Sequence, residues 1–458
     1  MKPVIRSLLA AAALAAGFSR AEAEAPTGGA RFPLSASANG RYLVDSAGKP
    51  FFYQADTPWM MLLQLTLPEA EEYIADRKTK GFTALQIMMT GFFGMKNREG
   101  QLPFGPENDL TKPNEAYFTH TDRVIQMAAD KGMFLMIAPM WSGCCGEGWA
   151  GKAKNGDSKP LNLNGEANAR EWGEWLGKRY GKYDHIAWMM GGDKNPEESH
   201  ELIRQMARGI HEAAPRQLMT VHNAPGNSSA AFYDDQPWLA LNAAYTYEEV
   251  HEHISGEWRR TKPVRPVFLS ESGYEHESND GRGGAPFRLR RQAYGAVLSG
   301  ALAGHAYGHR DLWRVNPAWR ASLQDPGSKQ MTHVRQLFAT REWWKLEPEP
   351  AEKLVTHGRG KVGDVDYMTA AIASDRSMAM VYIPQARKLT VDLSTLAAPV
   401  KARWFDPADG NLKPVQANPI ANVGTRDFSP PEKNASGDSD WILLLETFRE
   451  SLPVNENP

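Results

Sequence analysis

Two acidic residues close short apolar runs of the sequence and could work together in acid–base chemistry. Asp193 ends the run HIAWMMGGD, and Glu271 lies at a similar depth in PVFLSESGYE. One protonated and one ionised carboxyl group can together protonate a leaving oxygen and attack or activate water, as hydrolysis of a glycosidic bond requires. We therefore expect a glycosidase if the fold brings the two residues together. The competing role for Asp193 is to cap a helix that starts near Pro196.

Eight apolar runs alternate with helical patterns and must position these acids. The first helix opens with the capping box Thr66-x-x-Glu69 and ends before Gly81. Near-continuous apolar runs separated by helices indicate a parallel sheet buried on both faces, and eight such units close into a (β/α)8 barrel. An open doubly wound sheet is the competitor, but no Gly-rich phosphate loop follows the first run. The runs lie at 51–59, 82–90, 133–141, 185–193, 217–223, 238–246, 266–274 and 304–313.

The other strand ends supply the side chains of a carbohydrate pocket. A barrel carries its active site at the C-terminal ends of its strands, so acids on strands four and seven would face each other across a bound sugar. Aromatic rings can pack on sugar faces while polar groups orient the hydroxyls. For each tryptophan, core packing is the competing role. We predict substrate contacts from Asp56, Trp59, Gln86, Trp141, His222, Tyr245, Tyr307 and Trp313.

The sequence gives no sign of a catalytic metal, a cofactor or a serine nucleophile. Metal-dependent hydrolases on this barrel resemble one another in a His-x-His pair after strand one, where this chain has Gln54-Ala55-Asp56. Zinc would need three protein ligands, and the histidines are scattered. The G-x-S-x-G elbow is absent around Ser270. The only cysteines, Cys144 and Cys145, could form a strained vicinal disulfide or remain two free thiols.

Both ends of the chain carry further signals. In residues 1–25, Lys2 and Arg6 precede an apolar stretch too short for the ~20 residues that span a bilayer. Small residues follow, so we expect a cleaved signal peptide, a periplasmic or secreted protein, and no integral membrane segment. The net charge of −2, without a basic run, argues against a nucleic-acid partner. Nothing in the sequence specifies an oligomeric state.

The pattern changes after the last barrel helix. Short β-rich runs separated by turns, with no helical period, predict a C-terminal β-sandwich at 347–448, followed by a tail at 449–458. The catalytic domain then covers 32–346.

The chain resembles the apiosidase-like glycoside hydrolases of family 140. The resemblance rests on Asp-Thr-Pro-Trp at 56–59, Gly-Gly-Asp at 191–193, Ser-Glu-Ser-Gly-Tyr-Glu at 270–275 and the β-rich C-terminal region, and it spans about 32–447. It implies a (β/α)8 catalytic domain followed by a small β-sandwich once labelled a collagen-binding domain of a collagenase. It also implies exo-acting release of apiose from side chains of rhamnogalacturonan II, a pectin of the plant cell wall.

By position, the resemblance makes Asp193 the general acid/base and Glu271 the nucleophile of a retaining double displacement. Their carboxyl groups should then lie ~5 to 5.5 Å apart. The wider clan usually has Asn-Glu where this chain has Gly192-Asp193. That Asn commonly holds the sugar 2-hydroxyl, so the contact must come from elsewhere or be absent. The alternatives are a glycosidase for another pentofuranoside or pectic sugar, and a non-catalytic matrix- or carbohydrate-binding protein.

Overall fold

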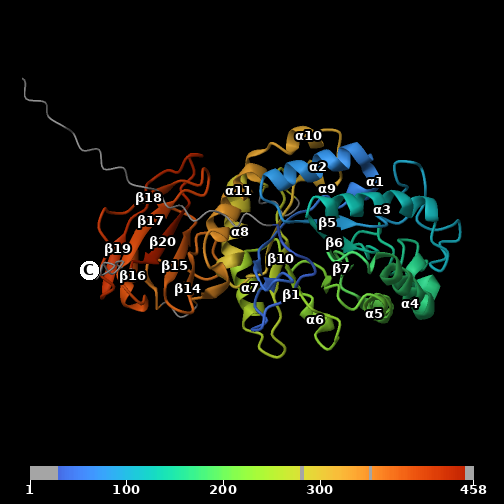
Figure 1. Ribbon diagram of the computed structural model, residues 1–458, viewed down its shortest axis with the longest axis horizontal. Coiled ribbons are helices and arrows are strands. Elements are labelled where there is room, and N and C mark those ends of the chain that lie inside the picture. The colour runs from blue at the N-terminus through green and yellow to red at the C-terminus, as the bar shows by residue number, and fades with distance from the viewer. Residues whose placement is uncertain (1–28, 279–282, 350–352, 449–458) are drawn as a thin grey trace, which may run out of the picture.

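The computed structural model describes residues 29–278, 283–349 and 353–448. The expected signal peptide and C-terminal tail lie outside these described residues. Figure 1 shows a large body of strands and helices beside a smaller, all-β body that carries the C-terminal part of the chain.

The large body is a barrel of eight parallel strands. Their order in the sheet is β8-β7-β6-β5-β4-β11-β10-β9. The two end strands are linked by the Ala240 amide, which donates to the Met219 carbonyl at 3.0 Å, and by the Ser229 hydroxyl, which donates to the Val221 carbonyl at 2.7 Å. The predicted (β/α)8 barrel is therefore confirmed. The strands are β4 (Tyr53–Asp56), β5 (Ala84–Met88), β6 (Phe134–Ala138), β7 (Ile186–Gly191), β8 (Met219–His222), β9 (Asn242–Tyr245), β10 (Val267–Glu271) and β11 (Gly304–Tyr307).

Helices surround the strands, and their starts follow local sequence signals. The capping box predicted at Thr66 and Glu69 is present at the start of α2. The fourth helix begins at Pro160 and kinks at Gly165, whose φ is 75°. The helices are α1 (Met61–Gln64), α2 (Leu67–Thr79), α3 (Glu115–Asp130), α4 (Pro160–Tyr180), η1 (Glu197–Ser199), α5 (His200–Ala213), α6 (Ala230–Tyr233), α7 (Val250–Trp258), α8 (Pro286–Leu298), α9 (Arg310–Trp313), α10 (Trp319–Ser322), α11 (Pro326–Ala339) and η2 (Trp343–Lys345).

Side chains alternate between the barrel interior and the helix layer along each strand, as the period of two requires. On β5, for example, Ala84 and Met88 belong to the interior core, whereas Leu85 and Ile87 pack in the helix layer. A small sheet of β1 (Ser35–Ala36), β2 (Leu43–Val44) and β3 (Pro50–Phe51) adds apolar side chains to the interior core at the N-terminal ends of the strands. The barrel interior is thus filled with apolar side chains below its C-terminal end.

The small body consists of antiparallel strands in two sheets, as the C-terminal pattern predicts. One sheet has the order β12-β14-β15-β20-β17-β18 and the other β13-β16-β19. On β20, Trp441 and Leu443 face the core of this body, while Ile442 and Leu444 join the core shared with the barrel helices. The strands and η3 are β12 (Leu346–Pro348), β13 (Val355–His357), β14 (Thr369–Ala373), β15 (Met378–Ile383), β16 (Leu389–Asp392), η3 (Leu393–Thr395), β17 (Val400–Phe405), β18 (Leu412–Pro414), β19 (Thr425–Phe428) and β20 (Trp441–Thr447).

The two bodies share a buried contact along α8. The rings of Tyr294 on α8 and Tyr382 on β15 stack with centroids 5.5 Å apart. One turn away, the buried Arg290 guanidinium lies 2.7 Å from Asp440 and 2.8 Å from Asp438. No helix of the described ranges is both long and apolar enough to cross a membrane.

Candidate active site

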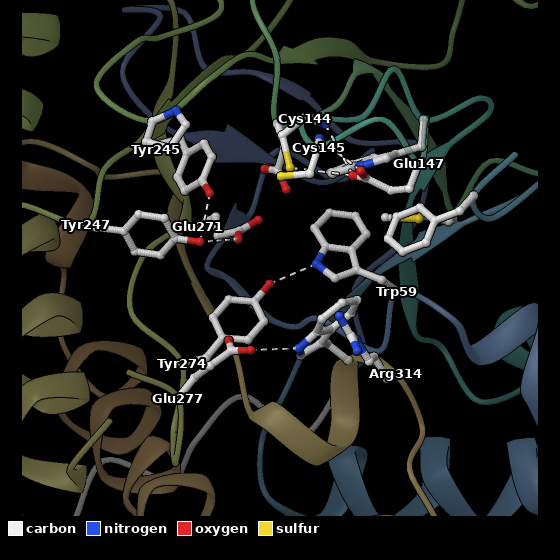
Figure 2. A pocket seen from close by; sticks show the side chains of 16 residues that line it. Trp59, Cys144, Cys145, Glu147, Tyr245, Tyr247, Glu271, Tyr274, Glu277 and Arg314 are labelled. Atoms are coloured by element: carbon white, nitrogen blue, oxygen red, sulfur yellow. Dashed lines mark hydrogen bonds between the residues drawn. The ribbon is translucent and has the colours of Figure 1, made fainter. Parts of the chain in front are cut away.

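A cavity of about 470 Å³ opens at the C-terminal ends of the barrel strands (Figure 2). Its walls combine aromatic rings with a few acidic and polar groups, which is the composition of a site for a small polar ligand. Six of the predicted site residues line it: Trp59, Trp141, Asp193, Tyr245, Glu271 and Trp313. The other lining residues are Met88, Phe92, Cys144, Cys145, Glu147, Pro225, Tyr247, Tyr274, Glu277 and Arg314.

A β-bulge on β10 turns Glu271 into this cavity. Leu269 pairs with Ala244 of β9 and Glu271 with the next residue, Tyr245, so that Ser270 is an extra residue in the ladder. Simple alternation from the inward-facing Phe268 would point Glu271 toward the helices. The bulge resets the alternation, and therefore both Ser270 and Glu271 face the interior.

Three successive left-handed residues aim Asp193 at the same place. The φ angles are 77° at Gly191, 139° at Gly192 and 42° at Asp193. A Cβ atom on Gly192 would lie 2.4 Å from the Trp141 ring, so only glycine fits there. The Trp141 ring thus occupies the space that any side chain at position 192 would need. Asp193 does not cap the helix that follows, since the N-cap of η1 is Pro196.

His222 joins the two carboxylates from beneath the cavity. Its buried Nε2 lies 3.2 Å from an Asp193 oxygen and 3.2 Å from a Glu271 oxygen. Burial alone would lower the pKa of the imidazole, but hydrogen bonds to the two carboxylates outweigh it and raise the pKa to about 9. The ring stacks on Tyr245 with centroids 4.6 Å apart. At neutral pH His222 is therefore a cation held between both acids.

Glu271 lies deeper than Asp193 and has a perturbed pKa. Its side chain is 7% exposed, against 25% for Asp193. Burial raises the pKa of Glu271 to about 7, helped by the charge of Asp193 and opposed by His222 and Tyr247. An oxygen of each carboxylate and Nε2 of His222 all lie within 4.8 Å of one another. This is a close, coupled pair at the floor of the cavity.

Tyr247 is a site residue that the sequence analysis missed. Its hydroxyl donates to a Glu271 oxygen at 3.3 Å and accepts from the Tyr245 hydroxyl at 2.8 Å (Figure 2). The i, i+2 spacing from Tyr245 at the end of β9 was the available signal, because residues two apart on an extended chain share a face.

The cavity mouth contains further residues that come from loops. The Trp59 indole donates to the Tyr274 hydroxyl at 2.8 Å, and the Trp313 indole donates to Glu277 at 3.2 Å. The Arg314 guanidinium lies 4.3 Å from the centroid of the Trp313 ring. Tyr274 is the last residue of the predicted run 266–274 but lies three residues past the end of β10, and Glu277 and Arg314 lie beyond the predicted runs.

Two of the predicted substrate contacts point away from the cavity. Asp56 accepts from the Tyr73 hydroxyl at 2.6 Å and lies 3.3 Å from Arg77, fully buried in the helix layer. The Tyr307 hydroxyl donates to Glu275 at 2.5 Å on the same outer side. On β4 and β11 the residue before each, an alanine, faces the interior, so alternation directs both side chains outward. These two predictions are wrong.

Gln86 and His222 face the interior but do not line the cavity. The Gln86 amide donates to the Ser270 carbonyl at 2.9 Å and so supports the bulged residue of β10. Both side chains are fully buried. Their contribution is to hold the carboxylates, and the prediction that they touch substrate is not met by this geometry.

Among the described residues, three groups carry side chains of the kind that ligate metals. Asp193, His222 and Glu271 form one, but a protonated His222 has no free nitrogen for an ion. In the second, His276, His309 and Asp325, the Nδ1 atom of His309 accepts from the Asp311 amide, so its Nε2 donates to Asp325 at 2.8 Å. The third, Cys144, Cys145 and Glu147, has two unlinked thiols.

Comparison with known proteins adds family and fold. Residues 37–345 match the model of the apiosidase-like catalytic domain, and residues 350–446 match a domain described as "Putative collagen-binding domain of a collagenase". No curated protein sequence matches the chain.

Solved structures with this fold span nearly the whole chain. One described as a glycoside hydrolase is 24% identical with a TM-score of 0.79, covering 91% of this chain and 98% of its own. A family 5 glycoside hydrolase from Bacteroides vulgatus is also 24% identical, with a TM-score of 0.78 and coverage of 91% and 94%. At these identities the likeness concerns the fold.

Proposed function

The chain belongs to the apiosidase-like family and is a glycoside hydrolase, and from this premise we propose that it releases apiose from side chains of rhamnogalacturonan II by a retaining mechanism. Asp193 is the general acid/base and Glu271 the nucleophile. The observation that carries the proposal is the close pair of carboxylates, with oxygens within 4.8 Å of one another at the cavity floor. A retaining pair is ~5 to 5.5 Å apart, whereas an inverting pair leaves ~6.5 to 9.5 Å for a water molecule.

Burial raises the pKa of Glu271 to about 7, and two neighbouring groups oppose this rise and support the division of roles. A nucleophile must be ionised when it attacks, and Glu271 is held by the His222 cation and by the Tyr247 hydroxyl, both of which stabilise the carboxylate. A general acid/base must reach the leaving oxygen in the first step and the attacking water in the second. Asp193 is the more exposed acid, at 25% of its side chain, and lines the open part of the cavity.

The reaction then proceeds in two displacements. Glu271 attacks the anomeric carbon while Asp193 gives its proton to the leaving oxygen, and the C–O bond to the leaving group breaks. Asp193 next removes a proton from water, which attacks the same carbon and releases Glu271. The His222 imidazolium remains beneath both acids and offsets negative charge that forms or disappears on either.

The cavity supports exo action on a terminal sugar. It measures about 470 Å³ and lies between aromatic walls, with Trp59 on one side and Tyr245 on the other (Figure 2). We propose that a terminal sugar lies over Glu271 and that the next residue of the side chain reaches toward Trp313 and Arg314. We also propose export to the periplasm or beyond, supported by the signal-like pattern of residues 1–25.

The test is sugar release from rhamnogalacturonan II oligosaccharides and from a panel of aryl furanosides. We expect release of apiose by the wild type, and losses of at least ~10³-fold in kcat for Asp193→Ala and Glu271→Ala. Asp184→Asn is the matched control, because Asp184 lies just before the N-terminal end of β7, whereas Asp193 follows its C-terminal end. Release of arabinofuranose but not of apiose would show that the proposed sugar is wrong. Activity retained in either catalytic variant would overturn the mechanism. Binding of pectin without any release would favour a carbohydrate-binding protein.

A further inference from the structure

We propose that Cys144, Cys145 and Glu147 form a zinc site at the edge of the catalytic cavity, with three protein ligands and a fourth position open to the cavity. The three side chains lie together in the loop after β6, and all three line the cavity (Figure 2). The hydrolytic mechanism uses none of the three side chains. The site goes beyond the proposed function, since it would bind an ion whether or not apiose is the substrate.

The loop is built so that the ligands are held in place. A Cβ atom on Gly148 would lie 1.7 Å from the Ser142 carbonyl oxygen, and one on Gly143 would lie 2.4 Å from the Gly148 Cα. The two ends of the turn are therefore in close backbone contact. Within the turn, the amides of Cys144 and Cys145 donate to the two Glu147 oxygens at 3.2 and 2.9 Å. This fixes the carboxylate beside both thiols and leaves each oxygen a further lone pair for an ion.

The spacing of the ligand atoms matches tetrahedral zinc. With Zn–S bonds of ~2.3 Å and a Zn–O bond of ~2.1 Å, a tetrahedral ion needs about 3.6 Å between sulfur and oxygen and about 3.8 Å between the sulfurs. The Cys144 sulfur lies 3.5 Å from a Glu147 oxygen. All three ligand atoms lie within 4.8 Å of one another. Closing on an ion thus requires side-chain shifts of about 1 Å or less.

The chemistry of the ligands favours a soft or borderline d¹⁰ ion. Two thiolates and one carboxylate suit Zn²⁺, whereas Ca²⁺ and Mg²⁺ take oxygen ligands. Binding replaces two thiol protons by one Zn²⁺, so the net charge of the group is unchanged and two protons are released. The effect on hydrolysis is therefore steric. The ion and its fourth ligand would narrow the cavity on the Trp141 side, and we expect zinc to raise KM.

The two other groups of ligand-type side chains are weaker candidates for the same ion. His222 at its raised pKa of about 9 has no free nitrogen at neutral pH. The His309 ring already uses both nitrogens in hydrogen bonds. Only the thiols of Cys144 and Cys145 are both exposed and unlinked.

The experiment measures binding without substrate. Wild-type protein is reduced, freed of reductant, shown to contain two titratable thiols, and titrated with Zn²⁺ against a chromogenic chelator. Cd²⁺ serves as a second probe because its bonds to thiolates absorb in the ultraviolet. We expect one ion per chain, a thiolate band with Cd²⁺, and release of two protons in weak buffer. Zinc should raise KM for an aryl glycoside, and EDTA should reverse the effect.

Variants separate this site from the alternatives. Cys144→Ser and Cys145→Ser should each weaken zinc binding by at least ~100-fold, since even the loss of an outer partner costs ~10 to 100-fold. Glu147→Gln should weaken it while keeping both thiols, and circular dichroism checks that each variant is folded. Glu271→Gln is the control for an ion held between the catalytic acids, and it should bind zinc like the wild type.

Four results would overturn the proposal. They are absence of binding to the fully reduced protein, binding that survives the cysteine substitutions, binding lost in Glu271→Gln, and a pair of thiols that stays disulfide-bonded after reduction. None of them bears on the release of apiose, which is measured on metal-free enzyme.

Discussion

His222 should set the pH at which the enzyme becomes active. As the nucleophile, Glu271 must be ionised, and its pKa is raised to about 7, so activity should fall as the pH drops through about 7. The His222 cation, 3.2 Å from a Glu271 oxygen, is what keeps this pKa from rising further. Substitution of His222 by Gln places an uncharged amide donor near the position of Nε2. We expect the acidic limb of kcat/KM to move to higher pH.

The size of the shift follows from the geometry. A pair of unit charges 3.2 Å apart is worth about 5 kcal/mol at an effective dielectric constant of about 20, which is an upper limit here. In His222→Gln, water and the amide dipole replace part of this stabilisation of the Glu271 carboxylate. We expect a net loss of about 2 kcal/mol, which raises the pKa of Glu271 by about 1.5 units. Glu271 would then be ionised to ~0.3% at pH ~6 instead of ~10%, so the loss of ionised Glu271 alone should lower kcat/KM at that pH ~30-fold.

The assay is a pH profile of kcat/KM for wild type and His222→Gln with an aryl glycoside that the wild type cleaves. Tyr247→Phe is the matched control, because it removes a neutral hydrogen bond to the same carboxylate and should move the limb by less than ~1 unit. An acidic limb that stays in place in His222→Gln, or that moves to lower pH, would refute this account of the Glu271 environment.

Three further substitutions test the positioning of the site and the packing of the chain. Gly192→Ala should lower kcat/KM ~100-fold, because its Cβ would lie 2.4 Å from the Trp141 ring and displace the adjoining acid. Asp56→Asn should leave KM unchanged but destabilise the protein by ~1 to 3 kcal/mol in thermal or urea unfolding, because the buried Arg77 loses one of its two carboxylate partners and keeps only Asp76. Arg290→Leu should destabilise the protein by ~3 to 5 kcal/mol, because it leaves the buried Asp440 carboxylate between barrel and sandwich without its cation.

Matched controls exist for the glycine and the arginine substitutions. Gly437→Ala has a comparable φ of 83° but no atom within 4 Å of the new Cβ, so activity should be unaffected. Arg320→Leu removes a half-exposed ion pair with Glu72 and should cost less than ~1 kcal/mol. A KM raised by Asp56→Asn, or full activity in Gly192→Ala, would contradict the placement of these residues.

The barrel could be read from the sequence because each strand is buried on both faces and therefore appears as a continuous apolar run. Counting the runs placed Asp193 and Glu271 on strands four and seven, and the structure brings them to one cavity. Which face each strand-end residue takes was not readable in the same way. A run that is apolar at every position carries no alternation, and so Asp56 and Tyr307 were placed in the cavity although they point outward.

The direction of the Glu271 side chain could not be derived from alternation along its strand either. Strict alternation from Phe268 would have pointed it away from the cavity, and only the extra residue Ser270 in the ladder with β9 brings it in. No turn residue marks that bulge in the sequence. Tyr274 and Glu277 were missed for a different reason, since loop conformation beyond the strand determines where they lie. The glycine at 192, noticed as a departure from the clan, is explained by the Trp141 ring.

The stereochemistry of the reaction tests the central claim most directly. If Glu271 forms a covalent intermediate, cleavage of an aryl glycoside in the presence of methanol should give a methyl glycoside with the anomeric configuration of the substrate, which proton NMR resolves and which does not mutarotate. A methyl glycoside of retained configuration is the predicted result. An inverted first product would contradict the assignment of Asp193 and Glu271 as a retaining pair.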